Sequence, residues 1–163
     1  MCTASWLISD NGYQVFFNRD ELKTRKQAEP PARKQQHDIR YLAPVDSDAG
    51  GTWISVNEFG ITLCLLNNYA SSQQPGFENY RSRGQIISSV AHIDCLSKLV
   101  ARLGKVNLAC FKPFDLLMFE PDKDPCRLAW DGRKQQFYRN INMPITSSSY
   151  KTEEVLRSRL NQL

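Results

Sequence analysis

The sequence of 163 residues has no long hydrophobic run. A membrane-spanning helix needs about 20 consecutive apolar residues, and no stretch comes near that length. The first apolar run ends at Asp10-Asn11-Gly12 and no basic segment precedes it, so the pattern of a secretory signal peptide is missing as well. We therefore expect a soluble, cytoplasmic protein with no membrane span.

Paired metal ligands are also missing. The five cysteines form no CxxC pair, and an odd number of them in a cytosolic chain argues against a disulfide framework. Cys64, Cys95 and Cys110 lie in apolar surroundings and are interpreted as reduced core residues. His37 and His92 stand too far from other ligand types to indicate a metal site, so we interpret both as surface or loop residues.

The net charge is a modest +4, and much of the basic excess lies in residues 23–34. This segment mixes lysine and arginine with Pro30 and Pro31 and contains no aromatic side chain. Nucleic-acid surfaces usually interleave stacking groups or present a continuous basic helix, so we expect no nucleic-acid partner. The segment is interpreted as a solvated loop that could attract an anionic small molecule.

The chain length fits a single domain, residues 1–163. Asn-Gly between two apolar runs is the strongest short-range signal of a β-hairpin, so residues 3–9 and 13–17 should pair as antiparallel strands. Cys2 then lies at one end of this hairpin, beside the residues that follow the second strand: Asn18, Arg19 and Asp20.

Further strands and helices follow in an order that indicates an α+β protein. Turn residues separate short apolar runs that predict strands at 39–45, 52–56, 61–66, 115–120, 126–131 and 136–141. The pair 52–56 and 61–66 forms a second hairpin that ends at Asn67 and Asn68. Apolar spacing becomes helical between Gly84 and Leu103, with Asp94 as the expected cap between two helices, and Thr152 is the expected cap of a final helix.

A cysteine directly after the initiator methionine has two interpretations. As a small apolar residue, Cys2 can simply begin a buried strand. Alternatively, methionine aminopeptidase can remove Met1 before so small a residue, which would leave Cys2 with a free α-amine. That amine has a reference pKa of about 8 and can take the proton from its own thiol, so that one residue supplies both nucleophile and base.

Several segments resemble a known family. "MCTASW", "FFNRDELKTR", "DAGGTWISVNEFGITLCLLNNY", "RSRG" and the late "TSSSYKTEEV" are similar to segments of the NRDE family, named for the tetrapeptide at residues 18–21, which includes relatives of transport and Golgi organisation protein 2. More distantly, Cys2, Arg19-Asp20 and the "NEFG...LNNY" hairpin are similar to cysteine N-terminal nucleophile (Ntn) amidohydrolases of the penicillin V acylase and bile-salt hydrolase type.

This resemblance implies the Ntn-hydrolase-like αββα sandwich, in which two antiparallel sheets lie between helical layers. Relatives continue past the helix where this sequence stops, which implies a sandwich abbreviated at its C-terminus. An exposed apolar face or an unpaired sheet edge would follow, and a homodimer is the expected means of covering it.

The resemblance also implies catalytic roles. Cys2 would be the nucleophile and Asp20 would orient its amine. Arg19 would stabilise the thiolate, and Asn68 would donate a hydrogen bond to the oxyanion. In the acylases the arginine and the aspartate are separated by two residues, whereas here they are adjacent, so on a regular strand they would face opposite sides.

Other polar residues support this set. Asn18 and Asn67 lie beside the predicted catalytic residues and are reserve candidates for it. In "RSRG", Arg81 and Arg83 precede a predicted helix and could bind an anion at its N-terminus, although a solvated helix start explains them equally well.

Three functional hypotheses are compatible with these features. The first is an amidohydrolase that attacks a non-peptide C–N bond through Cys2 and requires no cofactor. The second is a protein that binds a small ligand in the same pocket without turnover, and the resemblance makes haem a candidate because family members are linked to haem handling, although no haem motif is present. The third, an adaptor in secretion, has no amphipathic or lipidation signal to support it.

Overall fold

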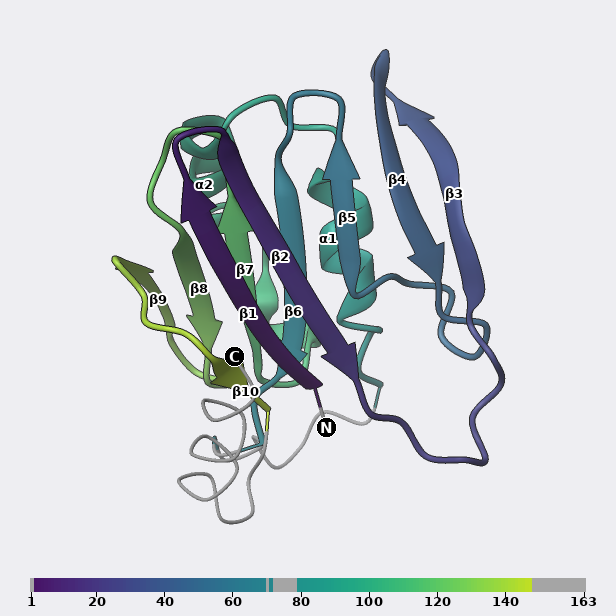
Figure 1. Ribbon diagram of the computed structural model, residues 1–163. Helices are drawn as coiled ribbons and strands as arrows, with labels where there is room; N and C mark the ends of the chain where they lie inside the picture. The colour runs from purple at the N-terminus through teal and green to yellow at the C-terminus, as the bar shows by residue number, and fades with distance from the viewer. Residues whose placement is uncertain (1, 70, 72–78, 148–163) are drawn as a thin grey trace.

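Two antiparallel sheets lie face to face, and helices cover the outer face of the larger sheet (Figure 1). The computed structural model describes residues 2–69, 71 and 79–147. Within these residues the smaller sheet consists, in order, of β10 (Ile145–Thr146), β1 (Cys2–Ser9) and β2 (Gly12–Arg19). The larger sheet consists, in order, of β3 (Glu29–Gln36), β4 (Ile39–Val45), β5 (Ile54–Asn57), β6 (Thr62–Asn67), β7 (Phe114–Phe119), β8 (Cys126–Trp130) and β9 (Gln135–Arg139).

The predicted first hairpin is confirmed. Ser9 pairs with Gly12 across a turn formed by Asp10 and Asn11. Gly12 has a φ of 117°, which a residue with a Cβ atom rarely adopts. The register that follows from this tight turn places Cys2 directly opposite Arg19 at the other end of the hairpin.

The second hairpin, β5–β6, is also confirmed, with Ile54 paired to Cys64. Asn57 closes its turn, because its Oδ1 accepts hydrogen bonds from the backbone N–H groups of Phe59 at 3.1 Å and Ile61 at 3.0 Å. Its Nδ2 donates to the carbonyls of Ala91 and Ile93, which attaches the turn to the helical layer. β6 then runs directly toward the Asn67-Asn68 pair.

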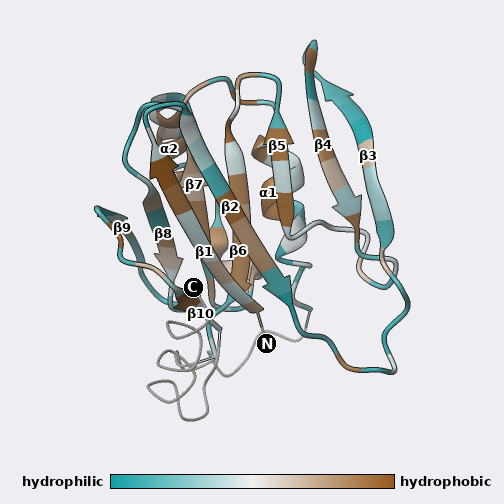
Figure 2. Ribbon diagram, in the orientation of Figure 1, coloured by the Kyte–Doolittle hydropathy of each residue, from teal (hydrophilic) through white to brown (hydrophobic). Residues whose placement is uncertain are grey.

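One prediction is wrong: the basic, proline-containing segment is not entirely loop, because residues 29–36 form the edge strand β3. The ladder with β4 is interrupted by a register shift between Glu29 and Ala32, where Pro30 and Pro31 lie. Proline lacks the N–H that a ladder needs, so it is tolerated at an edge or a bulge. Figure 2 shows β3 as largely hydrophilic, which suits an edge strand exposed to water.

The two predicted helices are α1 (Gly84–Val90) and α2 (Leu96–Leu103), and a short 3₁₀ turn, η1 (Leu108–Cys110), follows them. The expected cap by Asp94 is wrong. Cys95 occupies the N-cap position of α2, and the N–H of Leu96 donates to Glu120 Oε2 at 2.8 Å. Asp94 instead accepts from Lys98 at 2.8 Å. A carboxylate distant in the sequence therefore caps α2, which local spacing cannot reveal.

Strand β6 is buried on both faces because it lies between two cores. Leu63 and Leu65 point toward the helices, where they pack with residues of α1 and α2 such as Ile87 and Leu99. Cys64 and Leu66 point toward the small sheet. Burial of one such leucine side chain contributes about 1.5 to 3 kcal/mol. This division of alternate side chains between two cores holds the helical layer and both sheets together.

The α+β class and the antiparallel sandwich predicted from the sequence are confirmed. The side of the small sheet that faces away from the large sheet carries Leu7 and Phe16, which are 53% and 49% exposed. The predicted final helix at Thr152 lies outside the described residues. No helix in the described part of the chain is long and apolar enough to cross a membrane.

Candidate active site

Cys2 is the first residue of β1, and it borders a cavity of about 370 Å³. The residue is only 6% exposed and packs in the core between the two sheets with neighbours such as Ala4 and Cys64. We call the hollow beside it the Cys2 cavity. Its lining includes Arg19, Glu21, Asp46, Trp53 and Asn67, so the ends of both hairpins contribute to it.

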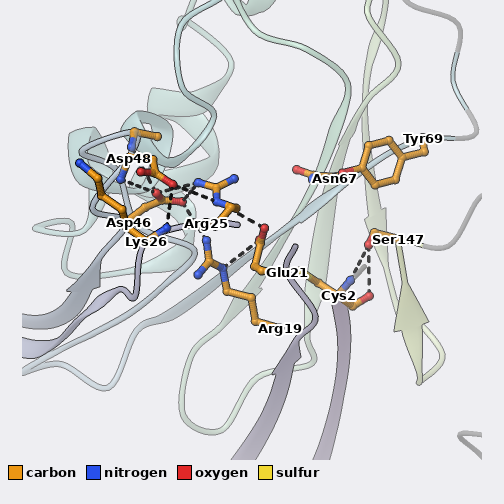
Figure 3. Close-up of polar contacts among 11 residues, drawn as sticks. Cys2, Arg19, Glu21, Arg25, Lys26, Asp46, Asp48, Asn67, Tyr69 and Ser147 are labelled. Atoms are coloured by element: carbon orange, nitrogen blue, oxygen red, sulfur yellow. Dashed lines mark hydrogen bonds and ion pairs between the residues drawn. The ribbon is translucent and has the colours of Figure 1, made fainter. Parts of the chain in front are cut away.

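The backbone of Cys2 is held by Ser147, the residue after β10. Ser147 Oγ accepts a hydrogen bond from the Cys2 nitrogen at 2.6 Å and donates one to the Cys2 carbonyl at 3.3 Å (Figure 3). The Ser147 N–H also donates to this carbonyl, at 2.9 Å. Thr146 Oγ1 also donates to that carbonyl, at 3.3 Å. The position of the candidate nucleophile is therefore set by a strand that comes from the other end of the described chain.

Arg19 faces Cys2 across the hairpin, and its guanidinium group lies against the ring of Trp53, 4.1 Å from the ring centroid. It forms ion pairs with Glu21 at 3.1 Å and with Asp46 at 2.8 Å. Its side chain is 18% exposed, so these contacts fix a largely desolvated cation beside the thiol.

Asp46 is the centre of a network of charges at the mouth of the cavity (Figure 3). It binds Arg25 at 2.6 Å as well as Arg19, and its Oδ1 accepts from the backbone N–H groups of Asp48 and Ala49. Burial alone would raise the pKa of Asp46, but these hydrogen bonds, above all that from Arg25, hold the pKa below its ordinary value. Asp46 is therefore a stable anion at neutral pH.

The two predicted asparagines occupy different positions. Asn67 lines the Cys2 cavity, and its Nδ2 donates to the hydroxyl of Tyr69 at 2.5 Å. Asn68 is not part of the lining, and its Oδ1 accepts from the backbone N–H of Ser71 at 3.3 Å. Of the two amides, Asn67 is the one that the structure brings to Cys2.

Asp20 and Asn18 also lie outside the lining of the cavity. Both are exposed, and Asn18 Nδ2 donates to Asp20 Oδ1 at 2.9 Å. β2 ends at Arg19, and the carboxylates that line the cavity beside Arg19 are those of Glu21 and Asp46. The alternation expected along a strand thus places Arg19 inward and its two neighbours outward.

Arg81, Arg83 and Lys112 also line the cavity. The backbone reaches this position through a close contact of two glycines. A Cβ atom at Gly84 would lie 2.6 Å from the Thr52 nitrogen, and one at Gly51 would lie 2.8 Å from the Gly84 Cα. Only glycine permits this approach, which brings the segment before α1 against the segment before β5.

The surroundings of the Cys2 thiol do not favour its ionised, nucleophilic form. Burial raises its pKa, and the negative charge of Glu21 acts in the same direction, while Arg19 opposes them. A base close to the sulfur is therefore needed if the thiol is to react near neutral pH. Among the other cysteines, Cys64 is fully buried, as predicted, whereas Cys95 and Cys110 are only partly buried.

The two histidines, predicted to be isolated, lie together. The ring centroids of His37 and His92 are 4.7 Å apart, because the β3–β4 turn meets the loop between α1 and α2. Neither belongs to the Cys2 cavity. Within the described ranges, no group of three or more acidic, histidine or cysteine side chains is arranged to hold a metal ion.

The fold of this chain is similar to that of solved hydrolase structures with the Ntn-hydrolase-like sandwich. Two variants of a conjugated bile acid hydrolase from Clostridium perfringens align with TM-scores of 0.65 and 0.63 at 14% and 15% identity. A penicillin V acylase from Agrobacterium tumefaciens aligns with a TM-score of 0.62 at 17% identity. Each alignment covers 99% of this chain and 57% of the other, so the chain spans little more than half the length of these proteins.

Comparison of the sequence with family models identifies the family of this chain. Residues 1–157 match the family described as Transport and Golgi organisation 2, and the chain belongs to that family. No curated protein sequence matches it. The resemblance expected from the quoted motifs is thus confirmed for the family and for the fold.

Four residues near Cys2 were not singled out from the sequence: Glu21, Asp46, Lys112 and Ser147. Glu21 had a signal, because it completes the tetrapeptide that names the NRDE family. Asp46 precedes a Gly-containing turn, which predicts backbone capping but no contact with Arg19. Ser147 lies in the segment "TSSSYKTEEV" that resembles the family, but its contact with Cys2 could not be predicted because it depends on pairing with a distant strand.

Proposed function

We propose that this protein is an N-terminal-cysteine amidohydrolase that cleaves a non-peptide C–N bond through an acyl-enzyme on Cys2. One observation carries the proposal: Cys2 borders a cavity directly beside a paired arginine, while its own nitrogen is held by Ser147. The family and the fold of the solved neighbours support it.

The first step requires a free amine on Cys2, which removal of Met1 would create. The amine then takes the proton of the Cys2 thiol, and Sγ forms a bond to the carbonyl carbon of the substrate as the carbonyl π electrons move to oxygen. The hydroxyl of Ser147 both donates and accepts, so it can hold the amine in either protonation state. The amine thereby meets the need for a base that the raised pKa of the thiol creates.

Collapse of the tetrahedral intermediate breaks the C–N bond, and the leaving nitrogen takes the proton from the Cys2 ammonium group. Water then attacks the thioester, the amine accepts a proton from the water, and the thiol departs with that proton restored. Asn67 is our candidate oxyanion donor because its amide lines the cavity. Asp20 remains the candidate for orienting the Cys2 amine, because its charge acts on Cys2. Asn68 remains a reserve candidate for the oxyanion donor.

Arg19 would stabilise the thiolate rather than act as a base. A guanidinium group stays protonated at all physiological pH values, and the ion pairs with Glu21 and Asp46 together with the Trp53 ring hold it in place. The positive charge favours the ionised form of Cys2.

Alkylation with iodoacetamide, read by peptide mass spectrometry, tests this function before a substrate is known. The chain is purified from cells and its intact mass determined, with removal of Met1 expected. The rate at which Cys2 is alkylated should then depend on pH through the titration of its own α-amine. Cys110, a half-buried residue of η1, serves as the control thiol. Retention of Met1 in the whole population would contradict the proposed mechanism, because the amine would be blocked.

A second candidate function is binding of a small ligand, haem included, in the same cavity without turnover. The raised pKa of the Cys2 thiol favours it, because an unactivated thiol is a poor nucleophile. Titration with haem should then produce a saturable shift of the Soret band. A signal equal to that of an unrelated protein of similar size would exclude haem as the ligand.

A further inference from the structure

The Cys2 cavity contains more positive than negative charge. Among the described residues, its lining includes five cationic side chains and two carboxylates: Arg19, Arg25, Arg81, Arg83 and Lys112 against Glu21 and Asp46. This excess of positive charge is not evenly distributed, because both carboxylates lie on one side of the Cys2 cavity.

Arg19 and Arg25 use both of these carboxylates. Arg19 binds Glu21 at 3.1 Å and Asp46 at 2.8 Å, while Arg25 binds Asp46 at 2.6 Å and Glu21 at 3.5 Å. Asp48 adds a third carboxylate, 3.6 Å from Arg25. This half of the cavity is therefore close to neutral.

The other three cations, which we call the basic wall, have only neutral partners within the described ranges. Arg81 donates to Gln85 at 3.0 Å and lies over the ring of Phe111. Lys112 lies over the ring of Tyr80, 5.6 Å from its centroid. No carboxylate of the described residues lies within ion-pair distance of Arg81, Arg83 or Lys112, although the charge of Glu21 acts on Arg83 at longer range. Within the described residues, the positive charge of this wall therefore has no direct carboxylate partner.

Arg83 is the most constrained member of the basic wall. Its Nη1 donates to the carbonyl of Pro113 at 3.0 Å, and the hydroxyl of Tyr69 is a second hydrogen-bond partner. Burial lowers the pKa of Arg83, while Tyr69, Cys2 and Glu21 raise it, so the guanidinium group lies within electrostatic range of the thiol and of one carboxylate. A half-buried cation without a direct carboxylate partner is costly unless an anion arrives to pair with it.

We propose that Arg81, Arg83 and Lys112 form an oxyanion-binding subsite, so that the molecule processed at Cys2 carries a carboxylate or a phosphate group. The assignment of this molecule as an amide substrate rests on the proposed function, whereas the anion site itself does not. With its anionic group on the basic wall, the molecule extends across the cavity and presents its carbonyl carbon to Sγ. Arginine suits this task because its planar fork binds two oxygens of a carboxylate or phosphate at once.

Isothermal titration calorimetry of the full chain with inorganic phosphate, and separately with acetate, tests the subsite at low salt. Arg83→Gln and the double variant Arg81→Gln/Lys112→Gln should each weaken binding of the preferred anion by about tenfold, the loss expected for a charged hydrogen bond. Arg133→Gln/Lys134→Gln removes two exposed charges from the β8–β9 turn and should change the affinity less than twofold. A preference for phosphate or for acetate identifies the group that the substrate carries.

Two results would overturn the subsite: no saturable binding of either anion to the wild-type chain, or losses in the basic-wall variants no larger than in the β8–β9 control. The double variant alters only exposed side chains, so it reports on binding even if Arg83→Gln fails to fold. Cys2→Ala should retain the wild-type anion affinity while it abolishes alkylation at this position. Saturable anion binding together with an unreactive Cys2 would therefore contradict the proposed hydrolase and support the subsite. A reactive Cys2 together with unchanged anion affinities in all variants would support the hydrolase and contradict the subsite.

Discussion

The Oγ atom of Ser147 lies 2.6 Å from the nitrogen of Cys2, although the two residues are 145 positions apart. Both groups are buried, and the Ser147 N–H returns a hydrogen bond to the Cys2 carbonyl. The candidate nucleophile is therefore positioned by a contact that forms only when β10 joins β1.

Ser147→Ala should destabilise the protein and disturb the reactivity of Cys2. The substitution leaves the Cys2 nitrogen as a buried donor without an acceptor, which costs about 1 to 3 kcal/mol. Urea denaturation measures this loss, and iodoacetamide alkylation measures the effect on the thiol. Ser9→Ala, which removes a weak exposed hydrogen bond of 3.4 Å, is the control and should change stability by less than about 0.5 kcal/mol. Equal stability of the two variants would contradict the assigned role of Ser147.

Opposite changes in the pKa of the Cys2 thiol are expected from two neighbouring substitutions. Arg19 favours the thiolate and Glu21 disfavours it. Arg19→Gln should therefore raise the thiol pKa and slow alkylation at pH 8 several-fold, because less thiolate is present. Glu21→Gln should lower the pKa and accelerate alkylation. The pH profile of the alkylation rate at Cys2 distinguishes these shifts from unfolding, and a shift in the same direction in both variants would refute this electrostatic account.

The stability contributed by Asp46 should disappear in acid. Its folded-state pKa lies below the ordinary value of 3.8, so its contribution is present in full above that value and is lost as the pH falls through the folded pKa. Asp46→Asn should cost about 1 to 3 kcal/mol at pH 7 and progressively less below pH 3.8. Urea denaturation of the wild type and of Asp46→Asn across this pH range measures whether the difference in their free energies of unfolding becomes smaller in acid. The exposed Asp38→Asn is the matched control and should be nearly neutral.

The contact of Gly84 with Thr52 predicts a strong difference between two glycine substitutions. Gly84→Ala places a Cβ atom 2.6 Å from backbone nitrogen and 2.7 Å from backbone oxygen, neither of which can move aside alone. We expect a loss of about 1 to 3 kcal/mol, typical of overpacking. Gly104→Ala meets only an ordinary contact of 3.5 Å at a negative φ, so it should be neutral or stabilise by about 0.4 to 1 kcal/mol. The midpoints of thermal unfolding of the two variants test this difference. Similar midpoints would show that the contact between Gly84 and Thr52 is not tight.

Much of the fold was predictable because its signals are local. The Asn-Gly pair predicts the first hairpin, but its two turn residues are Asp10 and Asn11, and Gly12 already pairs with Ser9. This position of the turn sets the register in which Cys2 faces Arg19. The continuous apolar run of β6 and the helical spacing around Ile87 are short-range patterns of the same kind. The edge strand β3 escaped prediction because Pro30 and Pro31 usually mark loops, and a bulge at an edge tolerates them only when a neighbouring strand is present.

In the candidate site, too, some features follow from local sequence and others depend on tertiary packing. The amino-acid sequence by itself determined that Cys2, Arg19 and an asparagine pair lie at hairpin ends, because backbone geometry carries hairpin residues to fixed places. Only the tertiary structure decided that Glu21 and Asp46, rather than Asp20, bind Arg19, and that Asn67 rather than Asn68 borders the cavity. The contact of Ser147 with Cys2 depends on the pairing of distant strands, and the place of Arg83 in the cavity lining depends on the packing of the segment before α1. No local pattern encodes either contact.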